Sequence, residues 1–235
     1  MDMITTVRNK KRISAWIAAI AGAVLLIVLM ERLFDDRRYR LISTVFAFLA
    51  CVPFYVTYEK REGSIRRMVL IAVMTAIAVA GRLVFAALPA FKPLAAVAVL
   101  SAIYMGPEFG FLVGSLSAVV SNIFFGQGPW TPFQMMALGL IGLVAGLPAF
   151  RSLLRRRVPL AVYGVLAGIS YSLIMDIWTV LSLAGGWRWD IYIAKLVTAV
   201  PYTATYAVSN VFFLELMLKP VGEKLNRIQT KHGIF

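Results

Sequence analysis

Eight apolar stretches follow one another along this chain, separated by short polar or basic segments. A helix needs about 20 mostly apolar residues to cross the hydrocarbon core of a bilayer. We therefore expect an all-α fold, a polytopic membrane helical bundle. The composition agrees, because 60% of the residues are hydrophobic and 15% are charged, whereas soluble domains average about 45–50% and 25%. The expected spans lie near residues 13–31, 41–57, 68–88, 94–105, 108–125, 132–150, 158–183 and 191–218.

Most of the 24 Lys and Arg residues fall into four clusters, within residues 8–12, 60–67, 151–157 and 219–231. Basic loops stay on the cytoplasmic side of a membrane, and a charge at the bilayer centre costs about 2.5–3.5 kcal/mol. The clusters predict a bacterial inner (plasma) membrane protein with both termini in the cytoplasm. They also explain most of the net charge of +13, so a nucleic-acid partner is not expected.

The stretch at residues 94–105 is short for a span, at about 18 Å of helix. Joining it to the stretch at 108–125 would give one long helix. Pro107 argues against this, because proline lacks the amide donor of a continuing helix. Joining the two would also place two basic clusters outside the cell. We therefore expect two spans, with the shorter one extended through Pro93 or buried by its neighbours.

The charged segment at residues 58–67 divides the chain into two parts. Residues 1–65 are expected to form an N-terminal transmembrane helical pair with a cytoplasmic linker. Residues 66–235 are expected to form a six-helix transmembrane core with a basic cytoplasmic tail. The stretch at 13–30 follows a basic start, as in a signal peptide. Its apolar run continues past any plausible cleavage point, so we expect an uncleaved helix.

The sequence lacks the motifs of the common catalytic sites. It contains no Gly-x-x-x-x-Gly-Lys-Ser/Thr phosphate loop, no His-Glu-x-x-His motif and no Gly-x-Ser-x-Gly nucleophile turn. Cys51 and His232 are each the only residue of their type, which excludes an intrachain disulfide and a two-histidine metal site. We expect neither an enzyme nor a protein with a cofactor of its own. An ion-coupled transporter is not indicated either, although Asp176 leaves proton coupling open.

Polar residues of the six-helix core gather toward its outer side on this topology. Arg82, Asn122, Gln134, Asp176 and Lys195 fall in the outer half or outer end of their spans. Ionisable groups at membrane depth usually face a bundle interior or a water-filled cavity. The pattern predicts a polar vestibule that opens outward and is rimmed by aromatic residues of the outer loops.

Each of these residues also has a plainer explanation. Trp187 and Trp189 could be anchors at the membrane interface. Asp176 could be a structural partner of Arg82 or Lys195, and Lys195 could extend to the membrane surface. The group of residues therefore supports a binding site better than any single member does.

The segment from Asn122 to Gln134 (N-I-F-F-G-Q-G-P-W-T-P-F-Q) is the most specific stretch. Its glycines and prolines predict a tight outer loop. Trp130 offers a flat apolar face, and the amides of Asn122, Gln127 and Gln134 offer donors and acceptors. Such a loop suits a neutral polar ligand, although it could be a mere connection between two helices.

Small residues recur at four-residue spacing on three expected spans, and this spacing lets helices approach closely. They are Ala72, Ala76 and Ala80; Gly110, Gly114 and Ala118; and Gly142 and Gly146. Most of them should be packing contacts inside the bundle. The alanine ridge, defined as Ala72, Ala76 and Ala80, could instead face a partner protein.

Several motifs resemble those of a known family. They are Ala72-x-x-x-Ala76, Leu88-Pro-Ala-Phe-Lys-Pro93, Gly106-Pro-x-x-Gly-Phe-x-x-Gly114 and Ser121-Asn-x-Phe-Phe-Gly-Gln-Gly-Pro-Trp-Thr-Pro132. Through them, residues 66–220 are similar to the S component, the substrate-binding subunit, of an energy-coupling factor (ECF) vitamin transporter. Within that family, the chain is most similar to the members assigned to cobalamin.

The resemblance implies a six-helix core that binds a vitamin on the outer side. It implies as partners a transmembrane coupling protein, contacted by the alanine ridge, and two cytoplasmic ATPases. Cobalamin is the favoured ligand, riboflavin or another vitamin is an alternative, and a membrane sensor or scaffold is the alternative from another class. No catalytic or metal-binding residue is predicted. The predicted substrate-binding residues are Arg82, Phe91, Lys92, Asn122, Gln127, Trp130, Thr131, Gln134, Asp176, Trp187, Arg188 and Tyr202.

Overall fold

The computed structural model describes residues 65–184 and 186–232, together with helical residues at 45, 48, 49, 51, 52 and 55. These residues form helices and no strand, so the all-α prediction is confirmed for the described part of the chain. The expected span at 13–31 and most of the one at 41–57 lie outside it, and the division of the chain at residue 65 stays a prediction.

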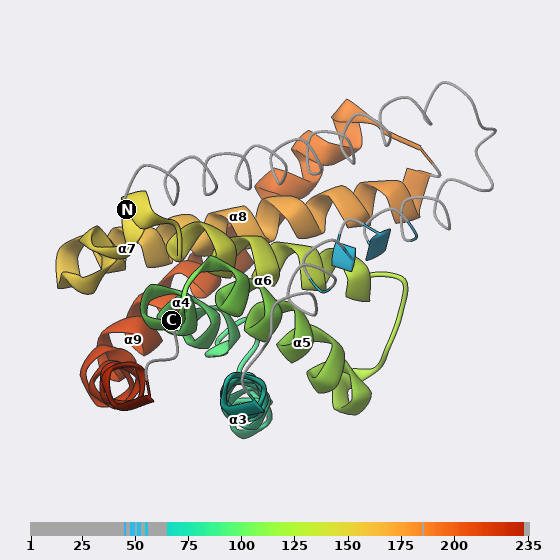
Figure 1. Cartoon of the computed structure of the whole chain (residues 1–235). Helices are drawn as coiled ribbons and strands as arrows, with labels where there is room; N and C mark the ends of the chain where they lie inside the picture. The colour runs from blue at the N-terminus through green and yellow to red at the C-terminus, as the bar shows by residue number, and fades with distance from the viewer. Residues whose placement is uncertain are drawn as a thin grey trace, which may run out of the picture.

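The helices are α3 (Ile65–Val84), α4 (Leu94–Met105), α5 (Pro107–Phe125), α6 (Thr131–Ala145), α7 (Pro148–Arg151), the 3-10 helix η1 (Leu153–Arg155), α8 (Arg157–Ala184) and α9 (Trp189–His232) (Figure 1).

α4 lies at the centre of the bundle, and all 12 of its residues are buried. It contacts α3, α5, α6 and α9, which surround it in Figure 1. A helix of this length is too short to cross a bilayer alone, but a helix enclosed by others does not need to meet lipid. The expectation that neighbours bury this short helix is confirmed.

α4 and α5 are separate helices because the chain turns at Gly106 and Pro107. Gly106 has a φ of 97°, which favours glycine because it has no Cβ. Pro107 then occupies the first turn of α5, where a missing amide hydrogen removes no helical hydrogen bond. The two stretches are therefore separate helices, and the expectation that each is a membrane span stays a prediction.

α5 and α6 pack closely through glycines. A Cβ on Gly142 would lie 2.4 Å from the carbonyl oxygen of Gly110, and a Cβ on Gly114 would lie 2.4 Å from that of Leu138. Helix backbones approach this closely only where small residues leave room. The prediction that these small residues are packing contacts is confirmed for α5 and α6.

Three described helices are long and apolar enough to cross a membrane, namely α3, α5 and α8. A fourth candidate is α6 with the α7–η1 segment, bent by 66°, where a single straight span was expected at 132–150. The bend follows from Pro148, because the residue before a proline favours an extended backbone. Leu147 has this conformation, with a ψ of 142°.

α9 is longer than expected, at 44 residues. The expected span ends at residue 218 and is followed by a basic cytoplasmic tail. The helix continues because its last part packs on the bundle. Leu225 is buried, and a Cβ on Gly222 would touch the Tyr104 side chain. The helix therefore extends beyond the expected span.

Candidate binding pocket

Arg82 lies in the last turn of α3, and its contacts with α5 fix its orientation. Its Nη1 donates hydrogen bonds to Ser121 Oγ and, at 2.9 Å, to Asn122 Oδ1. Its guanidinium carbon lies 4.5 Å from the centre of the Phe125 ring, which is a cation–π contact. A charged side chain is thus held in a defined position inside the bundle.

Asn122 connects Arg82 to α6 and α8. Its Nδ2 donates to Gln134 Oε1 at 2.7 Å and to Thr131 Oγ1 at 2.9 Å. Gln134 Nε2 in turn donates to the hydroxyl of Tyr171 at 3.3 Å. Asn122 is buried, and an unsatisfied buried amide would cost about 1–3 kcal/mol. We call these five residues, Arg82, Asn122, Thr131, Gln134 and Tyr171, the polar network.

Thr131 of the polar network also closes the loop between α5 and α6, through a hydrogen bond to Gln127. Thr131 Oγ1 donates to Gln127 Oε1 at 3.0 Å, and Gln127 Nε2 donates to the carbonyl oxygen of Val119 at 2.8 Å. The Trp130 ring lies over Gly128, where a Cβ would come within 2.3 Å of the ring. The loop is therefore tight, as its glycines and prolines predict.

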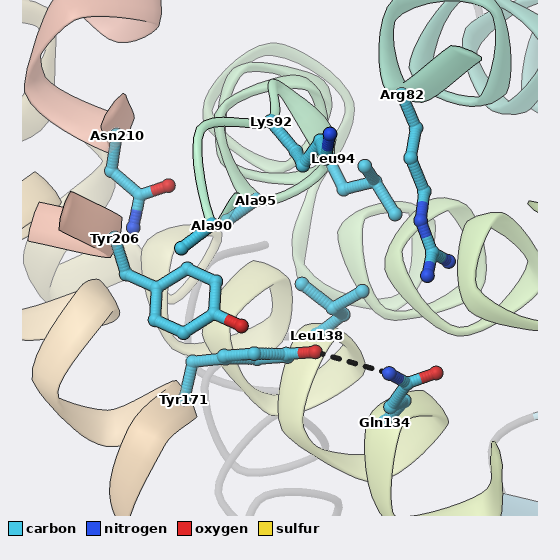
Figure 2. Close-up of a pocket in the computed structure, with 10 residues that line it drawn as sticks. All are labelled: Arg82, Ala90, Lys92, Leu94, Ala95, Gln134, Leu138, Tyr171, Tyr206 and Asn210. Carbon is cyan, nitrogen blue, oxygen red and sulfur yellow. Dashed lines mark hydrogen bonds between the residues drawn. The ribbon is translucent and has the colours of Figure 1, made fainter. Parts of the chain in front are cut away.

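A cavity of about 210 Å³ lies beside the polar network. Figure 2 shows Arg82 and Tyr206 on opposite sides of this pocket, with Tyr171 and Gln134 beneath them. The Tyr171 and Tyr206 rings meet edge to face, with 4.8 Å between their centres. The lining residues are Arg82, Ala90, Lys92, Leu94, Ala95, Gln134, Leu138, Tyr171, Tyr206 and Asn210. A few polar groups on an apolar lining are typical of a small-molecule site.

Lys92 reaches the pocket from the segment between α3 and α4. Ser209 of α9 holds this segment, since its Oγ accepts from Lys92 N at 2.9 Å and donates to Lys92 O at 3.1 Å. Lys92 Nζ donates to the carbonyl oxygen of Phe85. Burial, followed by the nearby charge of Arg82, lowers the pKa of Lys92. Two cations thus share one pocket, and none of the described residues that line it is acidic.

Phe91 packs beside the pocket rather than lining it. The centre of its ring lies 5.9 Å from that of Phe85, 5.5 Å from that of Phe212 and 5.1 Å from that of Phe213. Such aromatic pairs stabilise a contact beyond the area they bury. This cluster fastens the segment that carries Lys92 to α9.

The predicted site residues fall into three groups. Arg82, Lys92 and Gln134 line the pocket. Asn122, Thr131 and Gln127 support these residues through hydrogen bonds. The remaining ones are not part of the lining, and the assignment of all twelve residues to ligand binding stays a prediction. They are Phe91, Trp130, Asp176, Trp187, Arg188 and Tyr202.

Asp176 is buried in α8, and its Oδ2 has no hydrogen-bond partner among the described residues. The ion pairs of the described ranges join Arg157 to Glu215 and Arg188 to Asp190. Within those ranges, Asp176 forms no direct ion pair with Arg82 or Lys195, but Lys195 lies close enough to act electrostatically on its carboxyl.

Trp187 and Trp189 form an aromatic cluster with Tyr192 near the start of α9. The ring of Trp187 lies 5.1 Å from that of Trp189 and 5.0 Å from that of Tyr192, centre to centre. Arg188 Nε donates to Asp190 at 3.1 Å, and this hydrogen bond lowers the pKa of the Asp190 carboxyl. This arrangement fits the alternative of anchors at the membrane interface.

Sequence reasoning assigned none of the pocket residues Tyr171, Tyr206 and Asn210 to the site. Both tyrosines lie far from the ends of α8 and α9. Because tyrosine is enriched at the membrane interfaces, a tyrosine in the middle of an apolar span is itself a signal of a polar interior. Asn210 Nδ2 donates to the carbonyl oxygen of Gly164 at 3.3 Å, which places its amide at the pocket wall.

The pocket offers nitrogen donors and hydroxyl groups rather than metal ligands. Among the residues that the structure describes, no three His, Cys, Asp or Glu side chains come together as a metal site. The chemistry of the lining therefore suits an organic ligand.

Residues 66–219 match the family model described as ECF transporter, substrate-specific component. The chain belongs to this family. Substrate-specific components of ECF transporters are non-catalytic membrane subunits that pair with an ECF energy-coupling module. The predictions of a multi-pass membrane protein and of a subunit without enzymatic activity are therefore confirmed.

Relatives of this ECF component include two UPF0397 proteins. The one from Aliivibrio salmonicida is 27% identical over 149 residues, which cover 61% of this chain and 78% of that protein. The one from Vibrio atlanticus is 30% identical over 151 residues, with the same two coverages. No solved structure matches the chain.

Proposed function

We propose that this ECF component captures a vitamin at the outer face of the membrane for ATP-driven uptake by its partners. The observation that carries the proposal is the pocket beside the polar network. It brings two cations, an amide pair and two tyrosines together inside a helical bundle. Ionisable side chains at membrane depth are costly, and they usually mark a substrate or ion pathway.

The position of the pocket along the helices supports an outward opening. α3 begins next to Arg66 and Arg67 and carries Arg82 in its last turn. α6 carries Gln134 in its first turn, and the chain reaches Arg151 at the end of α7. The pocket thus lies at the helix ends away from the basic clusters, which the positive-inside rule assigns to the cytoplasm. This orientation would also keep both termini in the cytoplasm.

The alanine ridge supports contact with a membrane partner. Ala72, Ala76 and Ala80 are exposed on α3, whereas Ile71 and Met74 face the interior of the bundle. Exposed small residues at this spacing allow another helix to approach closely. We assign the ridge to the transmembrane coupling protein of the module, and ATP hydrolysis to its two cytoplasmic ATPases.

The size of the pocket bears on which vitamin binds. The resemblance favours cobalamin, a corrinoid with a nucleotide tail. Pockets for drug-sized ligands measure about 300–1,000 Å³, whereas this one measures about 210 Å³. Cobalamin would therefore require the pocket to widen. Smaller vitamins belong in the test panel beside cobalamin and riboflavin.

Reconstitution tests this function. The purified chain is titrated calorimetrically with a panel of vitamins and is then assembled with an ECF module in liposomes. We expect one vitamin to bind the isolated chain and its uptake to require ATP hydrolysis. The matched control is a module whose ATPases lack the phosphate-binding lysine. Ligand binding without uptake, together with recovery of a kinase in place of the ATPases, would favour the sensor alternative.

A further inference from the structure

The hydrogen-bond directions in the polar network are set by Arg82. A guanidinium group has donors only, so Asn122 must turn its Oδ1 toward it. Asn122 Nδ2 therefore faces Gln134, which accepts through Oε1. This leaves Gln134 Nε2 to donate to the oxygen of Tyr171. The hydroxyl proton of Tyr171 is then available to an acceptor in the pocket.

Arg82 itself presents further donors. Within the described part of the chain, both of its hydrogen bonds use Nη1. Its Nε and Nη2 protons form the edge of a guanidinium group that binds a carboxylate through two parallel hydrogen bonds. The face of the same group is covered by the Phe125 ring at 4.5 Å. A ligand therefore meets Arg82 at its edge.

The charge of the pocket is unbalanced. Arg82 and Lys92 both line it, and no acidic residue among those that the structure describes does so. Neither cation takes part in an ion pair of the described residues, which are Arg157–Glu215 and Arg188–Asp190. Arg82 is partly buried, and a cation that loses contact with water is unfavourable unless it is paired. An anionic ligand would supply the missing partner of both.

The remaining walls constrain the body of the ligand. Tyr171 and Tyr206 form an aromatic wall, with 4.8 Å between their ring centres. Asn210 donates through Nδ2 to Gly164, so its Oδ1 offers an acceptor on the Tyr206 side (Figure 2). The volume of about 210 Å³ is below the about 300–1,000 Å³ of pockets for drug-sized ligands. A small planar molecule satisfies these limits.

We propose that the pocket is selective for a compact organic carboxylate carried on a planar ring. This inference rests on the proposed function and adds the chemical class of the substrate. The carboxylate binds the Nε–Nη2 edge of Arg82 and the ammonium group of Lys92, and it accepts a hydrogen bond from Tyr171. The ring lies against Tyr206, and a donor group on the ring reaches Asn210 Oδ1.

Acid and amide pairs of the same molecule test this selectivity. 4-Hydroxybenzoate with 4-hydroxybenzamide, and 4-aminobenzoate with 4-aminobenzamide, differ in charge but hardly in size, and all four carry a donor group on the ring. Each is titrated calorimetrically into the purified full chain in lipid nanodiscs. We expect at least one acid to bind about tenfold or more tightly than its amide, because hydrogen bonds to a charged group are stronger than neutral ones.

Two variants identify the groups that make the difference. Arg82→Gln and Lys92→Gln each remove one charge and keep a polar side chain. Each should bring the affinity for the acid close to that for its amide. If Arg82→Gln does not fold, Lys92→Gln alone tests whether a pocket cation causes the preference for the acid. The control is Arg156→Gln, an exposed residue at the other end of the bundle, which should leave the acid preference unchanged.

The outcomes separate this inference from the proposed function. Equal binding of acid and amide, or no binding of any acid, would overturn the carboxylate preference. Tight binding of riboflavin or cobalamin that neither variant alters, with ATP-driven uptake intact, would leave the proposed function standing and remove this inference. A chain that binds no vitamin and supports no uptake would count against both.

Discussion

Asn122 Nδ2 lies 2.7 Å from Gln134 Oε1, and this hydrogen bond joins α5 to α6 beside the pocket. Asn122 also accepts from Arg82 at 2.9 Å. One buried amide therefore connects three helices. The ligand site and the packing of the bundle depend on the same side chain.

Replacing Asn122 with Ala should destabilise the protein and weaken ligand binding together. Arg82, Thr131 and Gln134 would each lose a partner, and a buried group left unsatisfied costs about 1–3 kcal/mol. Thermal unfolding in detergent measures the first effect, and calorimetric titration the second. Asn226→Ala, an exposed position on α9, is the matched control and should change neither. Wild-type stability of Asn122→Ala would mean that the network does not hold the helices.

The crossing of α5 and α6 predicts an unusual response to alanine. In an exposed helix, Gly→Ala stabilises by about 1 kcal/mol. At Gly142 the new Cβ would lie 2.4 Å from the carbonyl oxygen of Gly110, and overpacking costs about 1–3 kcal/mol. We therefore expect Gly142→Ala to lower the unfolding temperature. Gly164→Ala is the comparison with a less severe contact, because the new Cβ would lie 3.1 Å from Leu214 Cδ1 and 3.2 Å from the backbone nitrogen of Val211. Equal effects of the two changes would contradict the close backbone contact.

Local rules in the sequence were enough to predict several elements. The break between α4 and α5 follows from Gly106 and Pro107, which act on their own backbone. The four-residue spacing of the glycines in α5 and α6 predicts that these two helices cross closely. Arg82 and Gln134 stand out because ionisable and amide groups are rare in apolar spans. Each of these signals is contained in a few neighbouring residues.

The rest of the site depends on how distant helices are rotated against one another. Tyr171 and Tyr206 meet because Gly168 lets α8 approach α9 near Ala207, and no local pattern fixes that contact. The loop amides were interpreted as contacts for a neutral ligand. In the structure, Asn122 and Gln127 bond to protein groups instead. Their partners lie on other turns and other helices, so hydrogen-bond direction could not be read from their spacing.

The alanine ridge predicts a separation of binding from assembly. Ala72 and Ala76 are exposed on α3, so replacing both with Leu should leave folding and ligand affinity unchanged. The larger side chains would keep a partner helix from approaching. Pull-down of the ECF module should then fail, while calorimetric titration of the isolated chain stays normal. Ser170→Leu, exposed on α8, is the control and should keep the module. Loss of ligand binding together with assembly would argue against a ridge that faces the partner.

Gln134 and Trp130 lie four residues apart, and the structure predicts different roles for them. Gln134 lines the pocket and holds the Tyr171 hydroxyl, so Gln134→Ala should weaken binding by about tenfold, the equivalent of one hydrogen bond at about 1.4 kcal/mol. Trp130 is not part of the lining, and its ring lies over Gly128. Trp130→Ala should therefore change the affinity for a compact ligand by less than about twofold, within the scatter of surface substitutions. Both affinities are measured by calorimetric titration with the same ligand.

An equal loss in the two variants would mean that the ligand extends from the pocket across the α5–α6 loop. A molecule that long is larger than the cavity, and this result would return cobalamin to first place among the candidates.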